Sequence, residues 1–165
     1  RAKHHAKGIR YEYFDESMRQ SEDVEFWLRV ALSTKYKFAG IGDELTLYRI
    51  NMSGLSANLE KQYDAWLYSV EQQAKIDNIF VERWFSLASA YQKRYLARRA
   101  VQARNPKAAL KLITQALITN PRILIEEPSR TLVTLVCSLF CMLPEGIYKS
   151  IENIGIRAQQ KMHTS

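Results

Sequence analysis

The chain has 165 residues, of which 47% are hydrophobic and 25% charged, and this fits one globular domain with room for a small appendage. Its six glycines and four prolines exclude a collagen-like or low-complexity chain and weaken an all-β interpretation. The two cysteines, Cys137 and Cys141, exclude a disulfide scaffold, and no Cys/His cluster has zinc-site spacing. We therefore expect reduced thiols in a cytoplasmic setting.

The net charge of +7 is concentrated in the second half of the chain. Residues 1–82 carry 11 basic and 13 acidic side chains, whereas residues 83–165 carry 13 basic and 4 acidic ones. This asymmetry favours an anionic partner such as a membrane surface, and its alternative is an ordinary solvated helix face. No nucleic-acid-binding motif accompanies the charge, so we expect no nucleic-acid partner.

The first ten residues are basic rather than apolar, so they do not predict a signal peptide. The first expected element is a helix over Glu22–Ser33, with Ser21 as its N-cap. Its apolar face would contain Val24, Trp27, Leu28 and Ala31. Acidic residues in its first turn suit the positive end of the helix dipole.

A short strand pair is expected next. Tyr36–Ile41 and Leu45–Ile50 have the composition of strands, and Gly42-Asp-Glu between them has that of a turn. A polar loop over residues 51–56 follows.

The remainder of the chain is expected to be helical. Long amphipathic patterns cover Leu59–Ile76 and Phe80–Ala103, and Lys107–Thr119 places apolar residues on one face. Asn105-Pro106 and Asn120-Pro121 are expected to open helices, because a capping residue precedes a proline in both pairs. The predicted fold class is therefore mainly α.

Residues 131–143 form a run without charges that ends before Pro144. As a helix this run would be about 20 Å long, short of the ~30 Å hydrocarbon core of a bilayer, so we expect no span. Two interpretations stay open. The run is either a buried core helix or a segment lying in the plane of a membrane surface, which the nearby basic residues favour.

The acidic start of the first helix is the sequence feature most suggestive of chemistry. A carboxylate there can act as a general base, although acids in a first helical turn are also common for structural reasons. Asp23 and Glu25 form a D-x-E, but residues two apart lie about 200° apart around a helix, so they would chelate a metal poorly.

The motif series around this helix resembles a known enzyme family. Residues 14–16 read F-D-E, residues 22–29 read E-D-x-E-F-W-L-R, and residues 48–53 read Y-R-x-N-x-S. This order and spacing, from Gly8 to Ser56, resembles the carboxyl-terminal half of family 2 glycosyltransferases. Those are inverting enzymes of the GT-A α/β fold that use nucleotide-activated sugars.

The resemblance implies roles for particular residues. Asp23 corresponds to the catalytic base and Glu22 to a supporting acid, whereas Arg29 is expected to form an ion pair. Substrate contacts are expected from four residues: Trp27, Tyr48, Arg49 and Ser53. Arg49 would either bind a donor phosphate or pair with Asp43 or Glu44.

The resemblance also implies partners: a nucleotide-sugar donor, a glycan or lipid-linked acceptor, and a divalent Mg or Mn ion in the complete enzyme. Asn51 stands where the family commonly has histidine, and the chain has no D-x-D, so we expect it to carry no metal itself.

The expected organisation follows. Residues 1–58 are expected to form the acceptor-side end of a GT-A domain, and residues 59–165 a helical extension. Association of this extension with the inner face of the plasma membrane stays open. The chain is interpreted as a carboxyl-terminal fragment that is inactive alone. The alternative is a non-catalytic basic helical module that binds a membrane surface or a protein partner.

Overall fold

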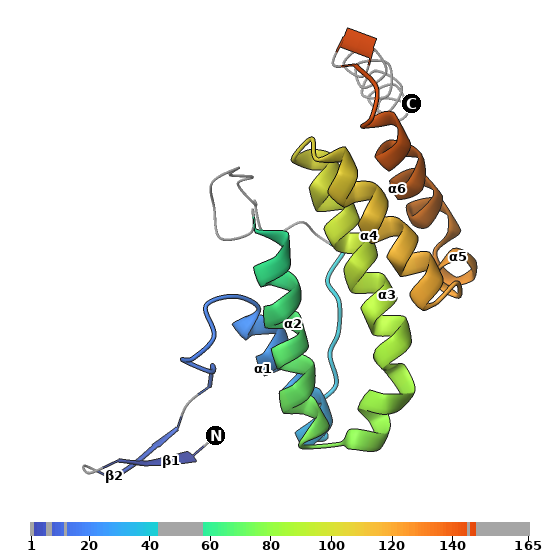
Figure 1. Cartoon of the computed structure of the whole chain (residues 1–165). Coiled ribbons are helices and arrows are strands. Elements are labelled where there is room, and N and C mark those ends of the chain that lie inside the picture. Colours follow the sequence, from blue (N-terminus) through green and yellow to red (C-terminus); the bar gives the residue numbers. More distant parts are fainter. Residues whose placement is uncertain (1, 6–7, 12, 43–57, 145, 148–165) are drawn as a thin grey trace. The chain divides into compact units, whose positions relative to one another are not determined.

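The computed structural model describes residues 2–5, 8–11, 13–42, 58–144 and 146–147, and this part of the chain is mainly helical, as the sequence predicts (Figure 1). The chain divides into two compact units. Unit 1 comprises Arg1–Ala88 and unit 2 comprises Ser89–Ser165. The division lies inside one continuous helix, α3 (Asn78–Gln102).

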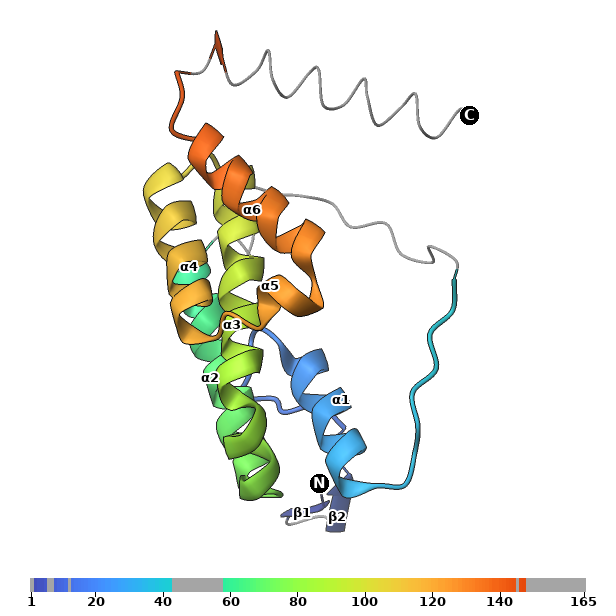
Figure 2. The same cartoon turned by 90° about the vertical axis from the view of Figure 1, so that its right-hand side faces the viewer.

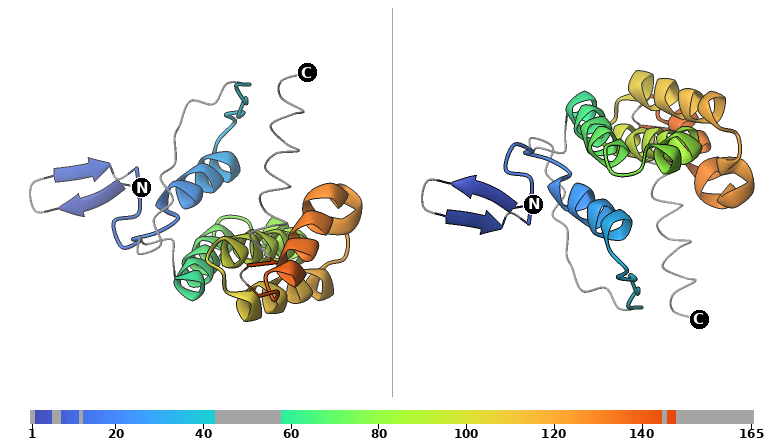
Figure 3. Two further views of the ribbon diagram at one scale, coloured as in Figure 1. Left: turned by 90° about the horizontal axis from the view of Figure 1, so that it is seen from above. Right: turned by 90° about the horizontal axis from the view of Figure 1, so that it is seen from below.

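Unit 1 begins with a hairpin that the sequence analysis does not predict. Strands β1 (Ala2–His5) and β2 (Gly8–Tyr11) pair antiparallel, with Ala2 opposite Tyr11 and His5 opposite Gly8 (Figure 3).

The expected strand pair of the GT-A type is not present among the described residues. Tyr36–Ile41, predicted as its first strand, has no strand assignment. Its predicted partner Leu45–Ile50 lies outside the described residues. The composition of Tyr36–Ile41 suits a strand, but a strand also needs a neighbour to satisfy its backbone groups, and composition does not supply one.

Helix α1 (Glu22–Ser33) begins and ends at the predicted residues, and it packs against α2 (Leu59–Ala74). Ser21 stands at the N-cap of α1, but its side chain makes no capping hydrogen bond and its backbone is left-handed, with φ of 60°. In α2, by contrast, the Asn58 side chain caps the helix by accepting a hydrogen bond from the Lys61 N–H at 3.0 Å.

The predicted apolar face of α1 is not its buried face. Val24, Trp27 and Ala31 are exposed, whereas Glu25 is completely buried. The reason is the contact with α2, where Gln73 Nε2 donates to the backbone carbonyl of Glu25 at 3.4 Å. Hydrophobic periodicity gave the helix correctly but not the side that packs, because the partner helix decides which side is covered.

The apolar core of unit 1 is small, and among the described residues its buried hydrophobic side chains are Trp66 and Leu87. Trp66 of α2 is buried and stacks on Phe85 of α3 with ring centroids 6.0 Å apart, and Tyr63 lies 5.5 Å from Trp66.

Unit 2 contains the second half of α3, then α4 (Pro106–Thr119), α5 (Ile123–Glu126) and α6 (Pro128–Phe140) (Figure 2). Helix α6 packs against α4 and α5. Fully buried alanine, leucine and isoleucine side chains form the core: Ala97, Ala100, Leu96, Ala109, Ile113, Ala116 and Ile123. The predicted apolar face of Lys107–Thr119 is confirmed, since three of these residues belong to it.

The two Asn-Pro pairs behave differently. Asn105 caps α4 as predicted, accepting from the Ala108 N–H at 3.1 Å, with Pro106 in the first turn. Asn120 instead ends α4, and its side chain accepts from the Arg122 N–H at 3.1 Å in a turn before α5. The expected helix start at Asn120 is therefore wrong, because the asparagine side chain closes a local turn.

Within the described residues, no helix combines the length and the apolar character needed to cross a bilayer. The expected domain boundary after residue 58, between the GT-A part and the helical extension, stays a prediction.

Candidate functional site

The segment that precedes α1 is held by a buried carboxylate. Asp15 is 7% exposed, and its Oδ1 accepts hydrogen bonds from the Ser17 hydroxyl at 2.6 Å and the Ser17 N–H at 3.1 Å. The Met18 N–H donates to the Asp15 carbonyl at 3.0 Å, which closes the turn. The aspartate of the F-D-E motif therefore has a structural role in this fold.

A buried ion pair ties that turn to α1. The Arg29 Nε lies 3.0 Å from Glu25 Oε1, and the guanidinium also donates to the backbone carbonyl of Tyr13. The guanidinium carbon lies 5.5 Å from the centroid of the Phe26 ring. The expectation that Arg29 acts as an ion-pair partner is confirmed, and Glu25 is its carboxylate.

The candidate base stands on the outer side of the same helix. Asp23 is exposed, and its Oδ1 accepts the Val24 N–H at 2.8 Å. Trp27 lies one helical turn further along and is 53% exposed, so the two side chains share a solvent-facing side of α1. Glu22, the predicted supporting acid, is half-buried at the first position of the helix.

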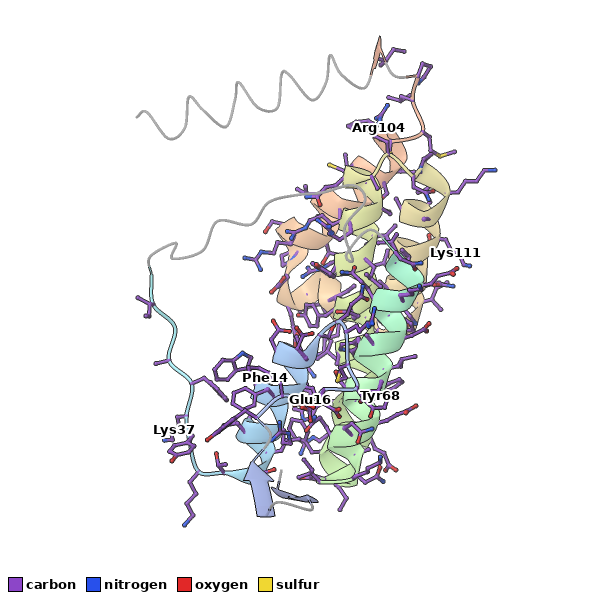
Figure 4. The ribbon with its side chains drawn as sticks, turned by 90° about the vertical axis from the view of Figure 1, so that its left-hand side faces the viewer. Phe14, Glu16, Lys37, Tyr68, Arg104 and Lys111 are labelled. Atoms are coloured by element: carbon purple, nitrogen blue, oxygen red, sulfur yellow. The ribbon has the colours of Figure 1, made fainter. Side chains whose placement is uncertain are left out.

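Two aromatic rings contact Trp27. Its ring centroid lies 4.9 Å from that of Phe26 and 5.5 Å from that of Phe38, which meets it edge-on. Phe14 lies 5.0 Å from Phe26. Figure 4 shows Phe14 beside α1 and Lys37 on the segment that follows the helix. Because Phe14 belongs to the F-D-E motif and Phe26 to the motif in α1, the two motifs are in direct contact.

The described residues do not fit a divalent metal. No group of three His, Cys, Asp or Glu side chains among them is arranged to hold an ion. Asp23 faces solvent while Glu25 is buried against Arg29, so the D-x-E does not form a chelate, as its helical spacing predicts.

The other expected substrate contacts lie elsewhere in the chain. Tyr48, Arg49 and Ser53 fall within residues 43–57, outside the described residues. The expected phosphate contact of Arg49 therefore stays a prediction.

A hollow of about 420 Å³ lies in unit 1 between the turn before α1 and helix α2. Its lining comes from the turn and from two α2 residues: Ser17, Met18, Arg19, Gln20, Ala65 and Tyr68. Figure 4 labels Tyr68 on α2. Asp23 and Trp27 do not line this hollow, so it does not coincide with the predicted base.

Unit 2 contains a second charged cluster, which the sequence analysis missed. Arg94 donates to Glu127 and, at 3.0 Å, to the hydroxyl of Thr131, and its guanidinium carbon lies 5.0 Å from the Tyr91 ring centroid. The Tyr91 hydroxyl donates to Glu126 at 2.6 Å. The hydrogen-bonded partners are 33 to 37 positions apart along the chain, so no local spacing in the sequence indicates these bonds.

The contacts in this cluster shift the pKa values of Tyr91 and Glu127. Burial, together with the hydrogen bond to Glu126, raises the pKa of Tyr91 to about 12. The hydrogen bond from Arg94 holds the pKa of Glu127 below its ordinary value.

Outside this cluster, burial raises the pKa of the Cys137 thiol on α6, so this thiol is protonated at neutral pH.

Comparison with known proteins gives no match: no family model fits the chain, and neither the curated proteins nor the solved structures contain a significant relative. The family resemblance therefore depends on the motif residues themselves.

Proposed function

We propose that this chain supplies the acceptor side of an inverting family 2 glycosyltransferase, with Asp23 as the general base. In the complete enzyme, a sugar would move from a nucleotide-sugar donor to a glycan or lipid-linked acceptor at the cytoplasmic side of a membrane. Residues 1–58 would belong to the GT-A domain and residues 59–165 to its helical extension.

The observation that carries the proposal is the difference in burial and bonding among the acidic residues in and before α1. Asp15 and Glu25 are buried and engaged with Ser17 and Arg29. Asp23 is exposed instead, one turn from an exposed tryptophan, Trp27. A carboxylate beside an aromatic surface is an arrangement suited to a sugar acceptor, since the ring can pack against a sugar face while the carboxylate takes a proton.

The proposed chemistry needs one proton acceptor from this chain. Asp23 accepts the proton of an acceptor hydroxyl as its oxygen attacks the anomeric carbon. The bond from that carbon to the phosphate oxygen breaks on the opposite face, and the nucleoside diphosphate leaves with the electron pair. The Val24 N–H, bonded to Asp23 Oδ1, would fix the carboxylate and leave Oδ2 for the proton. A divalent Mg or Mn ion would need ligands outside the described residues, and no step here depends on it.

The test replaces Asp23 in the complete enzyme, with the donor-binding half included. Asp23→Asn should lower the rate of nucleoside diphosphate release by about 10² to 10⁴, because the amide cannot accept the proton. Glu16→Gln is the matched control, since Glu16 is an exposed acid of the F-D-E motif that has no proposed role in the reaction. Equal rates for Asp23→Asn and the native enzyme would remove the base from the proposal.

The alternative is a non-catalytic helical module, in which the acids of α1 only suit the helix dipole. Asp23→Asn would then change stability by a few tenths of a kcal/mol and leave every other property intact. The excess of basic residues in unit 2 favours this alternative.

A further inference from the structure

Helix α6 has its polar side buried and its apolar side exposed. The buried side contains Thr131, Thr134 and Ser138, which are 0%, 6% and 0% exposed. The outward side contains large apolar residues that are 39% to 61% exposed: Leu132, Val133, Val136, Leu139 and Phe140. At about 100° per residue these five fall within one arc, opposite to the three hydroxyl residues.

The buried hydroxyl groups donate hydrogen bonds to backbone carbonyls one helical turn earlier. Thr134 donates to the carbonyl of Arg130 and Ser138 to that of Thr134, each at 2.7 Å, and Thr131 donates to the carbonyl of Glu127 at 2.8 Å. Because these side chains are small and already paired, α6 can pack closely on the buried alanines of α4. The large apolar side chains are left facing outward.

A basic groove borders this outward side. It has a volume of about 270 Å³ and is lined by Val133 and Thr134 of α6 together with Arg94, Tyr95, Arg98 and Arg130. Arg94 is occupied by Glu127, whereas Arg98 is exposed and has no acidic partner among the described residues. Arg130 is 77% exposed and lies 3.6 Å from Glu127.

The positive charge of unit 2 favours an anionic partner. Residues 89–144 contain nine basic and two acidic side chains. Both acids are engaged, Glu126 with Arg122 and Glu127 with Arg94. A second copy of this surface would meet the same positive charge, so an anionic partner is electrostatically preferred.

We propose that α6 lies in the plane of an anionic lipid surface, with its outward side among the acyl chains and the groove at Arg98 and Arg130 around a phosphate headgroup. The apolar arc supplies burial in the interface, and the arginines supply attraction to anionic lipid. This inference does not depend on sugar transfer. In the sequence, the helical spacing of Thr131, Thr134 and Ser138 indicates that one side of α6 is polar. The absence of charge over residues 131–143 does not indicate which side of the helix is buried.

The test is vesicle flotation of the 165-residue chain. Vesicles of equal parts phosphatidylcholine and phosphatidylglycerol are compared with vesicles of phosphatidylcholine alone. The native chain should float with the anionic vesicles and remain unbound with the neutral ones. Neither kind of vesicle contains a sugar donor or acceptor, so Asp23→Asn should float like the native chain whatever the outcome of the transferase experiment.

Two matched pairs of variants separate insertion from charge. Leu139→Asp should lower the bound fraction about tenfold, whereas Ile118→Asp, which makes the same charge change at a 78% exposed site on α4, should lower it less than about threefold. Arg98→Gln should lower binding about fivefold. Arg99→Gln should lower it less, since Arg99 is half-buried, donates to Gln102 and does not line the groove.

Circular dichroism checks that each variant is folded, and Val136→Asp repeats the test if Leu139→Asp is not. Absence of flotation by the native chain would overturn the proposal. Equal losses for Leu139→Asp and Ile118→Asp would overturn the insertion of α6. A native dimer that Leu139→Asp separates into monomers, without lipid binding, would assign the surface to self-association instead.

Discussion

At the scale of single residues, the most constrained charge is that of Glu25. Its side chain is completely inaccessible, and the Arg29 side chain beside it is only 15% exposed. A carboxylate removed from water in this way is tolerated because a planar cation bonds to both of its oxygens. The same arginine bonds to the Tyr13 carbonyl, so one side chain serves both the helix and the turn before it.

Arg29→Met should therefore destabilise the chain by about 3 kcal/mol or more, because it leaves the Glu25 carboxylate buried without a counter-charge. Denaturant unfolding followed by circular dichroism measures the difference. The double variant Glu25→Gln with Arg29→Met removes both charges and should recover part of the loss. A single variant within about 1 kcal/mol of the native chain would show that the pair is dispensable.

The Arg94–Glu127 pair predicts how stability depends on pH. Because the pKa of Glu127 is lower in the folded chain, its carboxylate stabilises the fold at neutral pH, and this contribution is lost as the pH falls through the lowered value. Glu127→Gln should therefore reduce the loss of thermal stability between about pH 5 and pH 2. Melting curves at several pH values measure this, with Glu71→Gln, at an exposed position on α2, as the comparison. An unchanged acid transition in Glu127→Gln would contradict it.

At the scale of elements, three residues, 103–105, connect α3 to α4. Arg104 has a left-handed backbone, with φ of 54°. Its N–H donates to the carbonyl of Val101 at 3.0 Å, and the N–H of Asn105 donates to that of Ala100 at 2.9 Å. These are the two bonds of a Schellman motif, in which glycine usually occupies the left-handed position. Asn105 then caps α4, so a single residue closes one helix and opens the next.

Position 104 should therefore reverse the usual preference of helices for alanine over glycine. Arg104→Gly should be about 1 kcal/mol more stable than Arg104→Ala, because both lose the arginine side chain and only alanine keeps the Cβ that disfavours this backbone. Thermal unfolding of the two variants gives the difference. If the alanine variant were the more stable, the left-handed conformation would not be a source of strain.

Helix positions could be predicted from the sequence where the determining signals are local. Glu22–Ser33 was predicted residue for residue, and Pro106 with its capping asparagine located the start of α4. The buried side of α1 could not be predicted, because Gln73 of α2 lies 48 positions from Glu25. The same reason explains the missed Arg94–Glu127 pair, which joins residues 33 positions apart.

The candidate site was predictable to a similar extent. The Arg29 ion pair follows from the one-turn spacing of Glu25 and Arg29. The exposure of Asp23 does not follow from its place in the first turn, because Glu25 of the same turn is buried. The burial of the polar side of α6 and the exposure of its apolar side were not predicted. An uncharged sequence indicates that the segment is apolar, but it does not indicate which of its residues face a neighbouring helix.

At the scale of the whole molecule, the two units differ in charge as well as in composition. The acids that suit the proposed sugar chemistry lie in unit 1, whereas the basic excess and the exposed apolar side of α6 lie in unit 2. Transfer to a lipid-linked acceptor and attachment to a lipid surface would then be tasks of different units. Loss of either function by substitution should leave the other measurable.

The distribution of aromatic residues has a spectroscopic consequence. All three tryptophans, Trp27, Trp66 and Trp84, belong to unit 1, while α4, α5 and α6 contain none. Tryptophan fluorescence, excited selectively over tyrosine, therefore follows unit 1, and far-ultraviolet circular dichroism follows the helices of both units. Coincident transitions in the two signals would indicate that α3, which continues through the division at Ala88, couples the units into one cooperative structure.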